Sequence, residues 1–376
     1  MARSAGEQRP IGAIQPGSRS LITPVIDLLC GGGFSILLMG LLLALVHTPL
    51  AASEFQVENM VLVSAIVNWP HFMVSYRLLY TSAETVRRYQ WAAITFPILL
   101  LGYSLYALAD SIQIKDFSNH YIFLYAVATF YLALHYTGQA WGTTATFAYI
   151  DGVSFTKLER GLLRNGLRVL AAWHMVWVTH QQRFVERLSS KEVLDLTPNE
   201  TDWLLEKIFF LQALVTVTAM ACLLIGVIVF ANIWRRSGRR PALRVVLPWL
   251  SIYLWYALVQ VMPGAFFWLQ ISHAIQYLIF PARVEMNRYS MRHPSSTQAG
   301  AGNRPMAKHM LIFYLILVAF GYAAFAGIPA ISSSANAGFV AGTVAVFINI
   351  HHYFVDGCIW KISNPAVRRD LFAHLH

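Results

Sequence analysis

The sequence contains too few charged residues to cover the surface of a water-soluble globule. Only 12% of its 376 residues are charged, whereas soluble domains carry about 25%. Hydrophobic residues make up 57% of the chain, and the mean hydropathy is +0.51. Part of the surface must therefore face lipid, and we predict an integral membrane protein.

Cysteine is also scarce. The three cysteines, Cys30, Cys222 and Cys358, all lie in apolar stretches and form no Cys-x-x-Cys pair. This spacing argues against a disulfide framework and against a cysteine-bound zinc site.

The basic residues are not concentrated in one region. The net charge is +10, but no separate basic domain is present, so nucleic acid is not a predicted partner. In a membrane protein, Lys and Arg collect on the cytoplasmic side of the bilayer, and the charge therefore carries information about topology.

Apolar stretches recur along the whole chain at lengths that suit a bilayer, whose hydrocarbon core takes about 20 helical residues to cross. We predict an all-α, polytopic transmembrane helix bundle with ten spans, forming a single domain over residues 1–376. The predicted spans are 22–48, 57–80, 88–109, 120–149, 163–184, 204–233, 242–262, 264–284, 307–329 and 337–361.

The distribution of Lys and Arg predicts the orientation of these spans. With the N- and C-termini both cytoplasmic, the cytoplasmic segments contain all but five of the 28 basic residues. This bias agrees with the positive-inside rule. Residues 1–20 are then a cytoplasmic tail, 185–202 the sizeable external loop, and 286–306 a flexible cytoplasmic loop. The five exceptions are Lys115, Arg183, Arg187, Lys191 and Lys207.

Apart from three histidines near span ends, seven histidines lie inside the predicted spans, where ionisable side chains are costly and are usually retained for a function. Five helices offer an imidazole within one slab, between the membrane midplane and the cytoplasmic face. In four of them the histidine lies roughly 9 to 15 Å from a cytoplasmic basic residue, from the helical rise. The seven are His71, His135, His174, His180, His273, His351 and His352.

Other polar residues share a helix face with these histidines, because positions three or four apart in a helix are neighbours. Four spans therefore have a polar seam that must avoid lipid, and the simplest packing turns all four seams toward one cavity. The seams are Asn68, His71 and Ser75; His135 and Gln139; Gln270, His273 and Gln276; and Asn349, His352 and Asp356.

These residue types predict a metal site, because neutral imidazole binds iron, zinc or copper and a carboxylate can complete the ligand set. Asp356 is the predicted catalytic residue or a further ligand. A single intramembrane histidine is more often structural, but histidines from five helices at one depth favour a site. The predicted ligands are His71, His135, His174, His273, His351 and His352.

A ligating histidine usually donates its second ring N–H to a neighbouring polar group. Asn68, Gln139, Gln276 and Asn349 are the residues that we expect to orient the ligands in this way. Iron without haem is the expected cofactor, with haem or zinc as alternatives.

The pattern resembles integral membrane non-haem iron oxygenases whose ligands are histidines on transmembrane helices. The nearest analogy is the bacterial β-carotene-cleaving dioxygenases of the Brp/Blh type. The resemblance covers architecture and type of ligand and includes no alignable motif. It implies an iron held by histidines and an apolar substrate that reacts with O₂. His-x-x-x-His and His-x-x-His-His clusters, which membrane desaturases and hydroxylases use, do not occur.

We therefore predict a metal-dependent oxidoreductase or oxygenase of the bacterial inner membrane, with membrane lipid as a partner and an apolar lipid or isoprenoid as substrate. Three alternatives stay open. Two facing histidines could ligate haem, a His relay could serve a proton-coupled transporter, and a His–Asp pair could act as general base in a lipid-modifying transferase.

Overall fold

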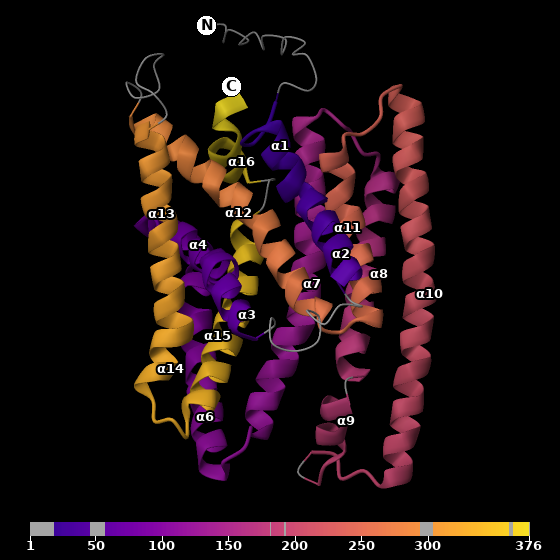
Figure 1. Ribbon diagram of the computed structural model, residues 1–376, viewed down its shortest axis with the longest axis vertical. Helices are drawn as coiled ribbons and strands as arrows, with labels where there is room; N and C mark the ends of the chain where they lie inside the picture. Colours follow the sequence, from indigo (N-terminus) through magenta and orange to yellow (C-terminus); the bar gives the residue numbers. More distant parts are fainter. Residues whose placement is uncertain are drawn as a thin grey trace, which may run out of the picture.

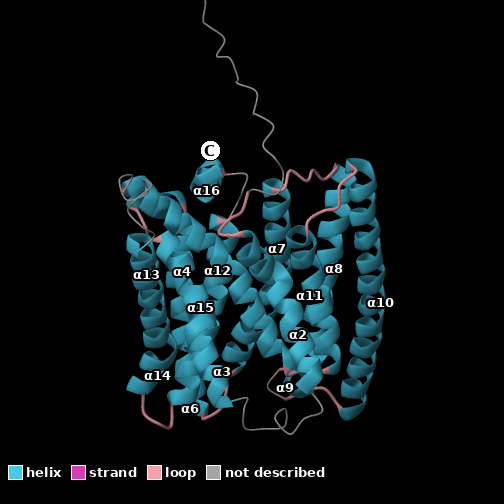
Figure 2. Ribbon diagram, turned by 45° about the horizontal axis from the view of Figure 1, so that its top comes forward, coloured by secondary structure: helices cyan, strands magenta, loops and turns pink. Residues whose placement is uncertain are grey.

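The computed structural model describes residues 19–45, 57–180, 182–191, 193–293, 304–360 and 364–375. These residues are 87% helical and contain no strand, which confirms the all-α prediction. Most of the helices run along the long axis of the molecule and form an upright bundle (Figure 1). Short helices and loops cover its two ends (Figure 2).

Several long rods of the bundle consist of consecutive helical segments that follow one another without a break. They are α1 (Pro24–Leu28), η1 (Leu29–Gly33) and α2 (Phe34–Leu45); α3 (Val57–Val63), η3 (Ser64–Asn68) and α4 (Trp69–Leu79); η4 (Trp91–Thr95) and α6 (Phe96–Ile114); and α13 (Arg304–Tyr322), η6 (Ala323–Gly327) and α14 (Ile328–Ile331).

The other long helices are single elements. They are α7 (Asn119–Ile150), α8 (Lys157–His180), α10 (Pro198–Ser237), α11 (Leu243–Val261), α12 (Ala265–Arg292) and α15 (Ala337–Ile359). The short elements are α5 (Ala83–Arg88), α9 (Gln182–Ser189), α16 (Pro365–Phe372) and η7 (Ala373–Leu375).

Six helices among the described residues are long and apolar enough to cross a membrane. Many of their large apolar side chains point outward, and on α10 Phe210, Val217 and Leu224 are all more than 60% exposed. A surface of this kind suits lipid and supports an integral membrane protein. The six are Pro24–Leu45, Trp91–Ile114, Pro198–Ser237, Leu243–Val261, Arg304–Ile331 and Ala337–Ile359.

The remaining long rods match the other predicted spans in position but are more polar. They are α3–α4, α7, α8 and α12, and each contains one of the predicted site histidines. The same polar residues that suggest a function therefore lower the hydropathy of these rods. The number of ten spans and the cytoplasmic orientation stay predictions.

Two predicted loops contain more helix than expected. Helix α12 continues to Arg292, and α9 with the first turn of α10 occupies much of residues 185–202. Helix α10 begins early because Thr197 and Glu200 form a capping box, in which each side chain accepts the backbone N–H of the other residue. Residues 1–18 and 294–303 of the predicted cytoplasmic segments lie outside the described residues.

Helices α4, α7, α12 and α15, which are relevant to the site, all run in the same direction. Each begins toward the lower end of the bundle in Figure 1 and ends toward the upper end. Both described chain ends also lie at the upper end, where His374 Nε2 is 2.9 Å from the Ser20 carbonyl oxygen. Helix α13 packs closely against the start of α4, where a Cβ at Gly321 would lie 2.6 Å from Cβ of Trp69.

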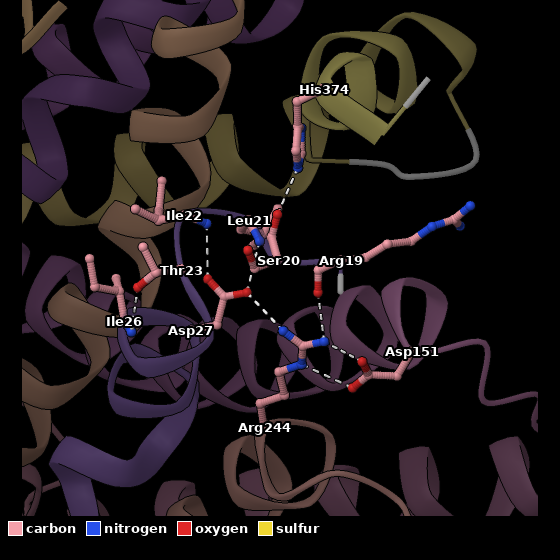
Figure 3. Close-up of polar contacts among 10 residues, drawn as sticks. All are labelled: Arg19, Ser20, Leu21, Ile22, Thr23, Ile26, Asp27, Asp151, Arg244 and His374. Atoms are coloured by element: carbon pink, nitrogen blue, oxygen red, sulfur yellow. Dashed lines mark hydrogen bonds and ion pairs between the residues drawn. The ribbon is translucent and has the colours of Figure 1, made fainter. Parts of the chain in front are cut away.

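A buried ion cluster joins three elements at the upper end (Figure 3). Arg244 of α11 donates to both carboxylate oxygens of Asp151 after α7, and its Nη1 lies 3.1 Å from Asp27 Oδ2 of α1. Asp27 also accepts the backbone N–H of Leu21 at 2.8 Å. Arg244 is only 7% exposed and Asp27 is fully buried.

Removing the cation should destabilise the fold. In Arg244→Met, the buried carboxylate of Asp27 and the partly buried carboxylate of Asp151 lose their partner. We expect the free energy of unfolding to fall by about 3 kcal/mol, as for other broken buried pairs. Thermal unfolding of the purified protein in detergent measures the change. The control is Arg239→Met, which replaces an exposed arginine at the same end. Equal unfolding midpoints for the two variants would contradict a structural role of the ion cluster.

Candidate metal centre

Four of the predicted histidines converge inside the bundle from four different helices. His71 lies on α4, His135 on α7, His273 on α12 and His352 on α15. Neighbouring ring centroids are 4.5 Å apart for His71–His352, 5.1 Å for His71–His273, 4.8 Å for His135–His273 and 5.0 Å for His135–His352. The four imidazoles thus form one compact group, which we call the histidine cluster.

The nitrogen atoms of the histidine cluster are close enough for shared coordination. One ring nitrogen each from His71, His135 and His273 lie within 4.8 Å of one another. The same limit holds for a second group, made of His135, His352 and a carboxylate oxygen of Asp356. Metal–nitrogen bonds are about 2 Å long, so small side-chain rotations would bring either group onto one ion.

A second polar layer lies one helical turn from the histidine cluster. In each of the four helices, the fourth residue after the histidine is polar. Because the four helices run in the same direction, these residues all lie on the same side of the cluster. They are Ser75, Gln139, Tyr277 and Asp356.

Hydrogen bonds within this layer hold Asp356 in place. Its Oδ1 accepts the hydroxyl of Ser75 at 2.7 Å and the hydroxyl of Tyr277 at 2.9 Å. Trp360 Nε1 donates in turn to the Tyr277 oxygen at 2.5 Å. With Oδ1 occupied, the second carboxylate oxygen, Oδ2, lies 3.4 Å from His352 Nε2. The layer therefore presents one carboxylate oxygen to the histidine cluster.

Several atoms at the centre of the cluster lack hydrogen-bond partners among the described residues. They are Nδ1 of His71, both ring nitrogens of His352 and Oδ2 of Asp356. His352 is fully buried, His71 is 1% exposed and Asp356 is 7% exposed. An unsatisfied buried polar atom costs about 1 to 3 kcal/mol, and one usual explanation is an ion that binds there. A metal ion would satisfy one ring nitrogen of His352 and Oδ2 of Asp356 together, since both residues belong to one candidate ligand group.

Two predicted ligands lie apart from the cluster. His351 directly precedes His352 but faces another side of α15, where its Nε2 is 2.7 Å from the carbonyl oxygen of Ala92. His174 of α8 is hydrogen-bonded to the hydroxyl of Tyr256 at 2.7 Å. Within the described chain, neither residue belongs to a group that could hold a metal.

The predicted orienting residues take different roles. Gln139 Nε2 donates to the backbone carbonyl of His273 at 2.9 Å and lies 3.5 Å from Gln276 Oε1. Asn349 accepts the hydroxyl of Tyr353 at 2.5 Å, and the Tyr353 ring stacks on His135 with centroids 4.6 Å apart. Asn349 therefore acts next to His135 rather than next to His352.

One predicted orienting residue does not contact the cluster, and two tyrosines that contact it were not predicted. No described hydrogen bond joins Asn68 to the histidine cluster. Tyr277 and Tyr353, in contrast, contact the cluster and were not among the predicted site residues. The position four residues after His273 could have indicated Tyr277, because Asp356 has the same offset from His352. No comparable offset indicates Tyr353.

A cavity of about 280 Å³ adjoins the histidine cluster. His135, Tyr277 and Asp356 are part of its lining, and most of the other lining is apolar or glycine. An apolar cavity with a few polar groups is typical of a small-molecule site. The rest of its lining is Tyr131, Leu134, Gly138, Gln139, Gly142, Thr143, Thr146, Phe280, Tyr353, Gly357, Trp360 and Leu371.

Comparison with known proteins does not identify the function of this site. The chain matches no protein-family model, no curated protein and no solved structure. The resemblance to histidine-ligated membrane oxygenases therefore stays a prediction, and the chemistry of the site has to carry the functional argument.

Proposed function

We propose that the protein is a membrane-embedded, metal-dependent oxidoreductase that acts on a lipid or isoprenoid substrate. One observation carries the proposal: four imidazoles and one carboxylate from four helices meet at a buried point with unpaired atoms. Helix-to-helix hydrogen bonding alone would leave these atoms paired, because unsatisfied polar atoms in a membrane interior are costly.

The donor set favours iron held without haem. His135, His352 and Asp356 form a group of two histidines and one carboxylate, which is the ligand type of non-haem iron oxygenases. Iron bound there would supply oxygen activation. Zinc also accepts nitrogen and oxygen ligands, so metal analysis has to decide between the two.

The residues around the cluster have separate tasks in this proposal. Ser75 and Tyr277 hold one oxygen of Asp356 and leave the other directed at the centre. The Gln139 amide donates to the backbone carbonyl oxygen of His273 and so holds the backbone at that residue. His135 and Asp356 also line the cavity, so an apolar substrate in the cavity would lie directly against the ligand group.

The geometry disfavours two of the alternative functions, haem binding and proton-coupled transport. A haem needs space for its macrocycle between two axial imidazoles, whereas Nε2 of His135 and Nε2 of His273 are only 3.0 Å apart. A proton pathway strings polar groups through the full membrane thickness. The cluster and its polar layer instead occupy about two helical turns.

Metal content tests the proposal directly. Purified wild-type protein should contain stoichiometric iron, and its optical spectrum should lack a Soret band. We expect His352→Ala to lose at least about tenfold in metal affinity, because effects of that size follow even the loss of residues that merely orient ligands. Elemental analysis after equilibration with a defined Fe²⁺ concentration provides the measurement.

The adjacent residue is a matched control for this variant. His351→Ala removes an imidazole from the same helix at the same depth, but on the face that contacts Ala92, and should keep its metal. Equal metal content in the two variants, or metal-free wild-type protein with full activity after chelation, would refute the proposed site.

We also propose ten spans with both termini in the cytoplasm. The two described chain ends lie at the same end of the bundle, which requires an even number of crossings. The concentration of Lys and Arg at the predicted cytoplasmic segments supports the orientation.

Reporter fusions test this topology. Green fluorescent protein fused after His376 should fluoresce, because it folds in the cytoplasm, and alkaline phosphatase at the same place should be inactive. A phosphatase inserted in the predicted external loop, after Lys191, should be active and is the positive control. The opposite pattern at the C-terminus would show that the orientation is wrong.

A further inference from the structure

The cavity beside the histidine cluster opens sideways through the wall of the bundle. Its mouth lies between α7 and α15, which pack against each other. Leu134, Gly138 and Gly357 line the cavity and are also exposed on the outer surface. Phe280 of α12 and Leu371 of α16 belong to its more deeply buried lining. The cavity is therefore reached from the flank of the molecule.

The depth of this mouth places it among lipid chains. Gly138 lies twelve residues before the end of α7 at Ile150, which corresponds to roughly 18 Å along the helix. The hydrocarbon core of a bilayer is about 30 Å thick. With α7 crossing the membrane, the mouth faces acyl chains, and a ligand would enter from the bilayer.

Glycines on α7 create the space inside the cavity. A Cβ at Gly138 or at Gly142 would meet no other atom within 4 Å. These glycines are therefore not needed for close helix packing, in contrast to Gly226, where a Cβ would lie 2.0 Å from the Trp249 ring. Larger side chains at Gly138 or Gly142 would extend into the cavity.

Two unpaired oxygens show which polar group the cavity would accept. Thr143 is 1% exposed, and its hydroxyl has no hydrogen-bond partner in the described chain. Gln139 Oε1 is also unpaired, and its amide orientation is set because Nε2 donates to the His273 carbonyl. Both residues line the cavity and lie one turn apart on α7.

An alcohol has the hydrogen-bonding groups that both oxygens lack. Its O–H donates to Gln139 Oε1, which can only accept, and its oxygen accepts the hydroxyl proton of Thr143. A ketone, an ether or a hydrocarbon has no proton to donate to Gln139. The pair of unpaired atoms therefore selects a ligand with a hydroxyl group.

We propose that the cavity binds a membrane-dissolved lipid alcohol, whose apolar chain lies between α7 and α15 and whose hydroxyl pairs with Gln139 and Thr143. The carbons next to the hydroxyl then lie within a helical turn of His135. The proposal rests on the proposed function for the meaning of the histidine cluster, but the binding itself can be measured without turnover.

Binding of farnesol, a long-chain isoprenoid alcohol, tests the proposal. Full-length protein in nanodiscs is titrated with tritiated farnesol, and tritiated farnesyl methyl ether serves as the ligand without a donor. Gly142→Leu fills the cavity and should weaken farnesol binding at least tenfold. Thr143→Val removes one hydrogen bond to the ligand oxygen and should weaken farnesol binding by about threefold to tenfold. The wild type should bind the ether more weakly than farnesol, because the ether has no proton for Gln139.

Matched controls separate these effects from general damage. Gly102→Leu makes the same change on the exposed face of α6, where a Cβ also meets no atom within 4 Å. Thr218→Val removes an exposed hydroxyl from α10 that bonds its own helix. Both should bind farnesol like the wild type. Gly142→Ala, a smaller change with the same direction of effect, replaces Gly142→Leu should that variant fail to fold.

The outcomes distinguish this proposal from the metal site. Any of three results would overturn the lipid-alcohol proposal. They are wild-type binding without saturation, equal binding of farnesol and its ether, and unchanged binding in Gly142→Leu and Thr143→Val. His352→Ala should lose metal and still bind farnesol. Metal-free wild-type protein that binds farnesol would refute the proposed function and leave the lipid-alcohol site standing.

Discussion

The cost of an unpaired polar side chain in the hydrocarbon interior of a membrane governs the arrangement of this bundle. Helices α4, α7, α12 and α15 each have a histidine seam that lipid cannot cover. Turning the four seams toward one point removes them from lipid and leaves apolar faces outside. The same packing concentrates imidazoles in a small volume. Stability in the bilayer and a candidate metal centre therefore follow from one constraint.

The common direction of these four helices then sets the order of the layers. A residue four positions after each histidine lies one turn further along the helix, and parallel helices place that turn at the same side of the cluster. Ser75, Tyr277 and Asp356 meet for this reason and bind one another. Helix α8, which contains His174, runs in the opposite direction (Figure 1). The ring of Tyr136 lies between His174 and His273 and so separates His174 from the histidine cluster.

The site is closed by side-chain contacts at one end and is open on its flank. Beyond the polar layer, α16 is fixed by Asn287, which donates to the Leu371 carbonyl at 3.1 Å, and by Arg288, which pairs with Asp370 at 3.0 Å. These contacts hold Leu371 in the lining of the cavity. On the flank, glycines leave the wall between α7 and α15 open. An end closed by these contacts and an open flank together direct ligand access toward the bilayer.

The amino-acid sequence was sufficient for the helical class, the approximate rods and the seams, because apolar length and helical periodicity are local properties. It also indicated the four converging histidines, Gln139 and Asp356, since position and spacing along one helix place a residue by depth and face. Only the tertiary structure separated His352 from His351 and removed His174, because the rotation of each helix about its axis depends on its neighbours. The ion cluster, the role of Tyr353 and the sideways cavity depend on contacts between distant segments, which no local pattern encodes.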